Sequence, residues 1–253
     1  MEQVETIENN SKEVVINIQH VRKSFGRHEV LHDINMELQK GENLVVLGRS
    51  GEGKSVAVKC IIGLLEQDNG IINVLGKEVK TLDENSIKSM RVKVGFLFQG
   101  GALYDSMSVR ENLTFPLIRV LNIRDNKEID KRIQEMLENV GLKEAIDKMP
   151  SELSGGMRKR IALARTLILK PEIILYDEPT TGLDPITAKE ISDLILNLHR
   201  KYKSSSLIIT HDMSCARITA DRILVLDKGI FVAAGTYDEL EKSENELVRS
   251  FFK

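Results

Sequence analysis

The sequence is poor in several residue types that mark particular classes of protein. It has 2 cysteines, no tryptophan and only 4% aromatic residues. The two cysteines, Cys60 and Cys215, are far apart and outside any Cys-x-x-Cys pair. This placement favours two buried thiols in a reducing compartment over a metal or redox role.

Strong charge of one sign and long apolar runs are also missing. The formal net charge of −2 gives no basic field, so nucleic acid is not expected as a partner. No stretch approaches the roughly 18 apolar residues of a membrane span. The acidic and polar segment 1–13 lacks the apolar core of a secretory signal, and we expect it to be a mobile tail. Action at a membrane would then require another chain.

What the sequence does have is a set of short apolar runs that each end at polar residues. They are 44–47 before a glycine-rich loop, 94–98 before Gln99, 173–176 before Asp177, 207–210 before His211, and 223–226 before Asp227. Continuous apolar runs are typical of strands buried on both faces, which indicates a parallel sheet covered by helices. Ligands of such sheets bind at the carboxyl ends of the strands, where these polar residues fall.

Other segments predict helices and antiparallel strands. Asp184-Pro185 predicts a helix start, with Asp as the N-cap and Pro in the first turn. Two apolar stripes at helical spacing are Ile191, Leu194, Ile195 and Leu198, then Ile129, Ile133, Leu137 and Val140 before Gly141. Residues 14–40 alternate as antiparallel strands with turns at Gly26 and Gly41. No strand pattern appears from Gln99 to about Thr166, which predicts a helical insert.

The glycine-rich loop has the spacing of a P-loop, Gly-x4-Gly-Lys-Ser, between a strand and an apolar helix. Its expected nucleotide-binding residues are Gly48, Arg49, Ser50, Gly51, Glu52, Gly53, Lys54, Ser55 and Val56. Backbone N–H groups, the Lys54 charge and the helix dipole would hold phosphates. We expect Ser55 to bind Mg²⁺ and Asp177 to reach it through water. Glu178 is the expected general base for the attacking water.

A second anion site is predicted at Ser154-Gly155-Gly156, which opens another helix. Two anion sites for one nucleotide make sense if two chains face each other head to tail, each closing the nucleotide site of the other. Asp184 would then lie across the interface, near the opposite P-loop. The basic residues 158–160 in the first turn of this helix are either a solvated face or contacts to the partner's nucleotide, and the sequence leaves both open.

In this order along the chain, the motifs resemble those of an ATP-binding-cassette (ABC) ATPase over residues 14–240. The resemblance implies an α/β fold of the P-loop NTPase type, a RecA-like mostly parallel sheet with an antiparallel β subdomain and a helical subdomain. It implies ATP and Mg²⁺ as cofactors. It also implies that His211 bonds the γ-phosphate and that Gln99 reaches magnesium and water. Phe25 would stack on the adenine, with Val30 in the same site.

On this basis the expected organisation is a single ABC ATPase domain, 14–240, after the tail 1–13. The core with its antiparallel β subdomain would comprise 14–98 and 166–240, and the helical subdomain 99–165. A short C-terminal tail, 241–253, would follow. The sequence leaves the role of this tail open.

One stretch is similar to a particular branch of the family. The segment 98–117, taken with 153–160 and 177–185, looks like the ATPase of Mla/Mce-type phospholipid transporters. The likeness implies an integral-membrane MlaE-like permease as partner, with an MCE-domain lipid-binding protein and a STAS-domain subunit as further candidates. It places the chain in the cytoplasm, peripheral on the inner face of the cytoplasmic membrane. Leu103, Tyr104 and Met107 are candidates for an apolar socket for a permease helix, with packing inside the insert as the alternative.

Two other functions stay open. ATPases of amino-acid or metal importers share the same motifs. A soluble ABC protein of the iron–sulfur assembly type has similar length, but its relatives usually carry Asn in the P-loop, where this chain has Arg49-Ser50. A non-catalytic module is not expected, because Lys54, Glu178 and His211 are all present. The sequence does not reveal the cargo or the direction of transport.

Overall fold

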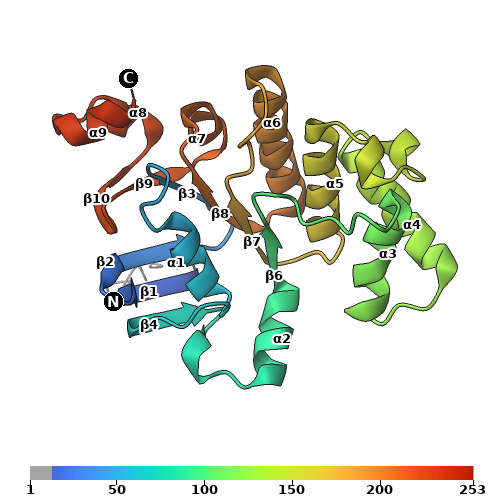
Figure 1. The fold of residues 1–253 in the computed structure, drawn as a ribbon, viewed down its shortest axis with the longest axis horizontal. Helices are drawn as coiled ribbons and strands as arrows, with labels where there is room; N and C mark the ends of the chain where they lie inside the picture. Colours follow the sequence, from blue (N-terminus) through green and yellow to red (C-terminus); the bar gives the residue numbers. More distant parts are fainter. Residues whose placement is uncertain (1–12, 253) are drawn as a thin grey trace, which may run out of the picture.

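The computed structural model of this chain describes residues 13–252 and contains two β-sheets with helices around them (Figure 1). The expected tail, 1–13, lies outside the described residues except for Glu13. In the described part of the chain, no helix is both long and apolar enough to cross a membrane.

The larger sheet has six strands in the order β10-β9-β3-β8-β7-β6. Its strands are β3 (Asn43–Leu47), β6 (Val94–Leu97), β7 (Ile173–Asp177), β8 (Ser205–Thr210), β9 (Arg222–Asp227) and β10 (Ile230–Gly235). All neighbours pair in parallel except β10, which turns back antiparallel on β9 at the sheet edge. The five apolar runs of the sequence are therefore confirmed as strands of one largely parallel sheet.

Each central strand contributes to two cores, which explains why its apolar run is continuous. In β3, Leu44 and Val46 belong to one buried cluster, while Val45 and Leu47 belong to the other. Because successive side chains of a strand point to opposite faces, a polar residue at any of these positions would be buried against one core or the other.

The first core lies between this sheet, helix α1 (Lys54–Ile61) and a second, antiparallel sheet. The second sheet has the order β2-β1-β4-β5 and consists of β1 (Val14–Phe25), β2 (His28–Gln39), β4 (Asn69–Val74) and β5 (Lys77–Glu78). The predicted antiparallel pair with a turn at Gly26 is confirmed. No clear sequence pattern indicated β4, β5 or helix α2 (Glu84–Lys93), which continue this part of the fold.

Helices cover the other face of the parallel sheet and extend into a separate lobe (Figure 1). They are α3 (Val109–Arg119), α4 (Asn126–Asn139), α5 (Gly155–Leu167), α6 (Pro185–Tyr202) and α7 (Met213–Thr219). Between Gln99 and Thr166 the described chain forms helices and no strand. Asp184 caps α6 as expected, accepting bonds from the Ile186 and Thr187 N–H groups at 3.1 Å.

The end of the chain forms two short helices, α8 (Tyr237–Glu241) and α9 (Glu246–Phe251). Val248 of α9 is fully buried, and the rings of Tyr237 and Phe252 pack edge to face with centroids 5.1 Å apart. Much of the segment expected to be a simple tail is therefore packed against the second core. Each helix is too short to show a clear apolar stripe in sequence.

Candidate active site

A cavity of about 510 Å³ lies at the carboxyl ends of the parallel strands. It gathers most of the residues that the sequence predicted for nucleotide binding and hydrolysis. Its lining consists of Phe25, His28, Val30, Ser50, Gly51, Gly53, Lys54, Ser55, Val56, Gln99, Glu178, Thr181 and His211. The cavity thus brings together side chains from five separate segments of the chain.

The phosphate loop joins β3 to α1 in a conformation that only glycine adopts easily. Gly51 and Gly53 have φ values of +89° and +98°. A Cβ on Gly53 would come within 2.8 Å of the Leu31 side chain, so space as well as backbone angle requires glycine here. The Glu52 carboxylate fixes the loop from within by accepting the Arg49 N–H at 2.9 Å. The loop is therefore preformed around the start of α1.

Lys54 is the central cation of the site, and only 5% of it is exposed. Its Nζ donates to the carbonyl oxygens of Gly48 and Arg49 at 2.7 and 2.9 Å. The same Nζ lies 3.2 Å from Oε1 of Glu178. An incoming phosphate would therefore compete with the Glu178 carboxylate for this ammonium group.

Ser55 and Asp177 are adjacent, as a magnesium site would require. The Ser55 hydroxyl donates to Oδ1 of Asp177 at 2.9 Å. Burial raises the pKa of the Asp177 carboxyl, and the bond from Ser55 opposes that shift. A cation beside this carboxylate would favour its ionised form, and hard oxygen donors are those that Mg²⁺ prefers. The residues present fit the ion.

The Glu178 carboxylate is held on both of its oxygens. Oε1 faces Lys54, while Oε2 accepts from the His211 backbone N–H at 3.3 Å and lies 2.8 Å from His211 Nδ1. The Thr181 hydroxyl also donates to Oε2, at 3.3 Å. Glu178 has φ +50°, a left-handed conformation that is uncommon for a residue other than glycine, Asn or Asp. With its backbone in this conformation, Glu178 places its carboxylate in the lining of the cavity.

Phe25 stands at the end of β1 with 48% of its surface exposed, so its ring face is open to the cavity. Asp68 accepts from Lys23 Nζ at 2.7 Å and from the Ser24 N–H at 2.6 Å, which fixes the strand end that carries the ring. Lys23 Nζ lies 5.6 Å from the ring centroid. Val30 lines the same side of the cavity, and the geometry is that of an apolar platform for a base.

Ser154, Gly155, Gly156 and Asp184 do not line this cavity. Ser154 caps α5 by accepting the Met157 N–H at 3.2 Å. The starts of α5 and α6 lie close together, because a Cβ on Gly156 would come within 2.5 Å of Thr187 Cγ2. The residues of the predicted second anion site and Asp184 therefore lie together, outside the lining of the cavity at the chain's own phosphate loop.

Gly48, Arg49, Glu52 and Asp177 also fall outside the cavity lining, although three of them contact residues that belong to it. Thr181 and His28 line the cavity without having been proposed as site residues. Thr181 lies in the segment 177–185 that the sequence analysis had singled out, so its position next to Glu178 could have been predicted. Nothing in the sequence pointed to His28.

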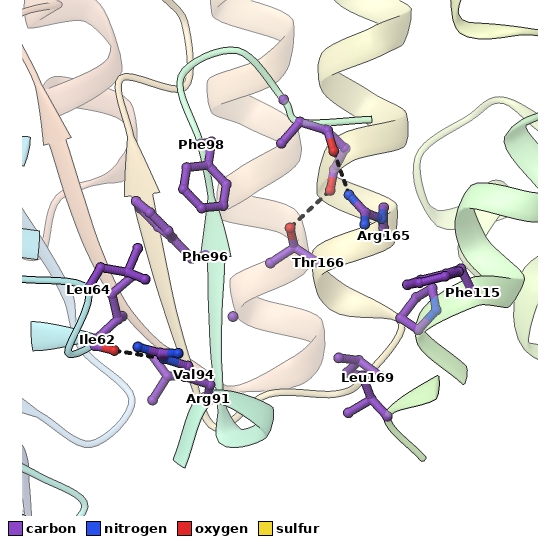
Figure 2. A pocket seen from close by; sticks show the side chains of 16 residues that line it. Ile62, Leu64, Arg91, Val94, Phe96, Phe98, Phe115, Arg165, Thr166 and Leu169 are labelled. Carbon is purple, nitrogen blue, oxygen red and sulfur yellow. Dashed lines mark hydrogen bonds between the residues drawn. The ribbon is translucent and has the colours of Figure 1, made fainter. Parts of the chain in front are cut away.

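A second groove, of about 340 Å³, lies beside Gln99 between β6 and the helical lobe. Figure 2 shows Phe96 and Phe98 on one side and Arg165, Thr166 and Phe115 on the other. Leu103, Tyr104 and Met107, the residues expected to form a socket, do not line it. Leu103 packs on the core, and the Tyr104 ring lies between Phe115 and Arg165. The position of Leu103 agrees with the packing alternative for that residue, and contact of this segment with a permease stays a prediction.

Comparison with known proteins identifies the family and the fold. The family model described as ABC transporter matches residues 31–181. The chain is 38% identical over 96% of its length to protein TRIGALACTOSYLDIACYLGLYCEROL 3, chloroplastic, of Arabidopsis thaliana, covering 74% of that protein. It is 39% identical over 94% of its length to the probable ribonucleotide transport ATP-binding protein mkl of Mycobacterium leprae, covering 68%. It is 37% identical over 92% of its length to the methionine import ATP-binding protein MetN of Clostridium tetani, covering 73%.

Two solved structures share the fold. One is cbiO1 from Clostridium perfringens, part of the ABC transporter complex cbiONQ, with a TM-score of 0.84, 27% identity and 94% of each chain covered. The other is the ATP-binding cassette MJ0796, a dimer in a post-hydrolysis state bound to ADP and Pi, with a TM-score of 0.79 and 30% identity. The match covers 88% of this chain and 98% of the MJ0796 chain. The chain therefore belongs to the ABC transporter family, as an ATP-binding subunit that hydrolyses ATP.

Proposed function

We propose that this chain is the ATPase subunit of a transporter that moves phospholipid, and that it works as a head-to-tail dimer on an integral-membrane permease. The observation that carries the proposal is the single cavity where the phosphate loop meets Gln99, Glu178 and His211. The chloroplast relative that is named after trigalactosyldiacylglycerol, with 38% identity over 96% of the chain, supports a lipid as cargo.

In the proposed mechanism, ATP places its phosphates on the loop 48–55 and its base against Phe25. Lys54 moves its charge from Glu178 to the phosphates, which releases the carboxylate to accept a proton from water. The His211 ring contacts Glu178 in this structure. In the proposed mechanism it leaves that carboxylate and turns toward the γ-phosphate. Ser55, Asp177 and Gln99 would hold Mg²⁺, and the ion would supply positive charge beside the phosphate oxygens.

The surface formed by Ser154, Gly155, Gly156 and Asp184 supports the proposed dimer. These residues lie together and outside the chain's own cavity, so they are available to a nucleotide held by a second copy. Ser154 and the start of α5 offer backbone N–H groups and the positive end of the helix dipole to an anion. A dimer of this kind has two ATP sites, each completed by both chains.

The groove beside Gln99 is the proposed docking site for a cytoplasmic helix of the permease. Its rim carries two arginines whose guanidinium groups are held by hydrogen bonds to backbone carbonyls. Arg91 donates to the carbonyls of Ile62 and Gly63 at 3.0 and 2.8 Å, and Arg165 donates to the Ala102 carbonyl at 2.6 Å (Figure 2). Between them the lining is mostly apolar, and Phe98 and Val120 are substantially exposed. A helix seated here would lie next to Gln99, the residue proposed to reach magnesium and water.

Amino-acid import is the second candidate, because the MetN relative is nearly as similar over most of the chain. The two cargoes are separated by purifying the chain with its native membrane partners and identifying the bound small molecules by mass spectrometry. ATPase activity of the reconstituted complex is then measured in phospholipid vesicles, with and without methionine. Bound phospholipid and activity indifferent to methionine support the proposal. A complex without lipid that responds to methionine would overturn the lipid assignment and leave the ATPase assignment intact.

A further inference from the structure

Lys159 of α5 points into the protein, although the sequence had suggested a solvated face or a contact to a partner's nucleotide. Only 8% of the residue is exposed. Its neighbours in sequence also reach back to their own chain. Arg158 donates to the Leu153 carbonyl at 3.2 Å, and Arg160 donates to the Val140 carbonyl at 3.2 Å and pairs with Glu190. Lys159 is therefore the buried member of this basic run, whereas Arg158 is exposed and Arg160 is half-buried.

The Lys159 ammonium bonds to two backbone carbonyls rather than to a carboxylate. Nζ donates to the carbonyl oxygen of Gln99 in a short hydrogen bond and to that of Glu178 at 3.4 Å. Burying a charged amine costs free energy unless it is hydrogen-bonded, and these two carbonyls are its partners. Apolar residues would pack a helix against a sheet without that cost, so the cation contributes something other than packing.

Both carbonyls belong to loops that carry proposed catalytic residues. Gln99 lies just beyond β6 and Glu178 just beyond the neighbouring strand β7, so the two loops leave adjacent strands. Glu178 holds a left-handed backbone conformation, and a hydrogen bond to its carbonyl helps to keep that peptide plane in place. One amine from α5 thus links the backbone of Gln99 to that of Glu178, the proposed general base.

We propose that Lys159 is a positioning residue for ATP hydrolysis, which ties the helix behind Ser154 to the loops of Gln99 and Glu178. The proposal rests on the roles proposed for those two residues. Lys159 lies about one turn beyond the Ser154 cap, on the same helix. If Ser154 binds the nucleotide of a second copy, a shift of this helix is passed directly to the chain's own hydrolytic residues. Lys159 would then link the two ATP sites of a dimer.

The test compares three full-length variants in the purified transporter complex. Lys159→Met keeps the length and removes the donor, Lys159→Arg keeps the donor and the charge, and Lys143→Met is the matched control. Lys143 is an exposed lysine of the same lobe whose Nζ pairs with Glu138 at 2.7 Å. For each variant, kcat and KM for ATP, the affinity for a fluorescent ADP analogue, and the melting temperature are measured.

We expect Lys159→Met to lower kcat by about 100-fold, because a misplacement of about 1 Å at a catalytic group has that effect. KM and ADP affinity should stay within about twofold, since the nucleotide-binding groups are untouched. Lys159→Arg should recover kcat to within about fivefold, because guanidinium can serve both carbonyls. Lys143→Met should match the wild type.

The proposal is overturned if Lys159→Met keeps the wild-type kcat. It is also overturned if kcat, ADP affinity and melting temperature all fall and Lys159→Arg does not rescue kcat. That second outcome would indicate a purely structural lysine. If Lys159→Met does not fold, Lys159→Leu takes its place under the same criteria, since its side chain also lacks a donor. Glu178→Gln is measured in parallel. If that variant remains active, the proposed base is wrong. If it is inactive while Lys159→Met is fully active, only the positioning role fails.

Discussion

At the scale of single residues, the site is held in a resting arrangement by its own charges. Lys54 and Glu178, which would act on different parts of ATP, lie 3.2 Å apart and are both buried. His211 occupies the other oxygen of the same carboxylate. Opposite charges at this distance in a poorly solvated site attract strongly, so nucleotide must displace an existing ion pair to bind.

Glu178→Gln removes the proton acceptor while keeping the shape of the side chain. We expect ATP turnover to fall by about 10²–10⁴-fold, the usual contribution of a positioned base. Nucleotide binding should be retained, since the amide competes less well for the Lys54 ammonium. Phosphate release and binding of a fluorescent ATP analogue measure the two effects, with Glu172→Gln, an exposed carboxylate paired to Lys93, as the control. Turnover within about threefold of the wild type would exclude Glu178 as the base.

The sequence predicted the residues of this cavity well where chemistry follows a strand end or a fixed spacing. The loop 48–55, Asp177-Glu178 and His211 each come directly after a buried apolar run, and parallel strands bring their carboxyl ends to one edge. It could not predict Lys159, because spacing along one helix does not reveal which basic side chain is turned inward. The roles of these residues in catalysis stay predictions.

At the scale of elements, continuous apolar runs were readable and short or interrupted ones were not. The strands β3, β7 and β8 are fully buried along their length, so each appears as an unbroken run. Strand β10 alternates less clearly at the sheet edge, and α8 and α9 have five and six residues. Such elements are fixed by tertiary packing, as the buried Val248 illustrates, and not by local pattern.

The groove between β6 and the helical lobe allows a direct test of docking. Phe98 and Val120 line it and are 40% and 43% exposed, so replacing both by Asp changes the surface more than the core. We expect assembly with the permease to weaken by about tenfold or more, because burying unpaired carboxylates costs about 2 kcal/mol or more. Pull-down of the permease by the variant measures this.

Ile71→Asp is the matched control for the groove. Ile71 is 41% exposed on β4 and does not line the groove. It should bind the permease as the wild type does, and the double variant should still bind nucleotide. Normal recovery of the complex by the Phe98→Asp/Val120→Asp variant would place the docking surface elsewhere.

At the scale of the whole molecule, the separation of Ser154 from the cavity predicts sites shared between two chains. Lys54→Ala and Ser154→Arg should each abolish turnover alone, the first by removing a phosphate ligand and the second by blocking the α5 start. Mixed chains form heterodimers with both lesions in one site and an intact second site. Partial recovery of ATPase activity on mixing would support the shared site, whereas full activity of Ser154→Arg alone would contradict it.

Burial of both thiols predicts how the folded chain responds to pH. Burial raises the pKa of Cys60 to about 11 and that of Cys215 to about 12, from 9.0. Above about pH 9 the unfolded chain loses these protons first, so stability should fall as pH rises toward those values. At pH 8 a thiol reagent should detect neither of the 2 cysteines in the native protein and both in denaturant. Rapid labelling of the native chain would contradict the buried placement.

The close approach of Gly156 to Thr187 changes how an alanine scan of the Ser-Gly-Gly turn must be interpreted. A methyl group at 156 would press against Thr187 Cγ2 at 2.5 Å and force the starts of α5 and α6 apart, whether or not a ligand ever touches that glycine. Thr187→Ser removes that methyl and keeps the hydroxyl that donates to Asp184 at 2.6 Å. Activity regained by the Gly156→Ala/Thr187→Ser pair would assign the glycine to helix spacing, and activity still lost would assign it to the approach of a nucleotide.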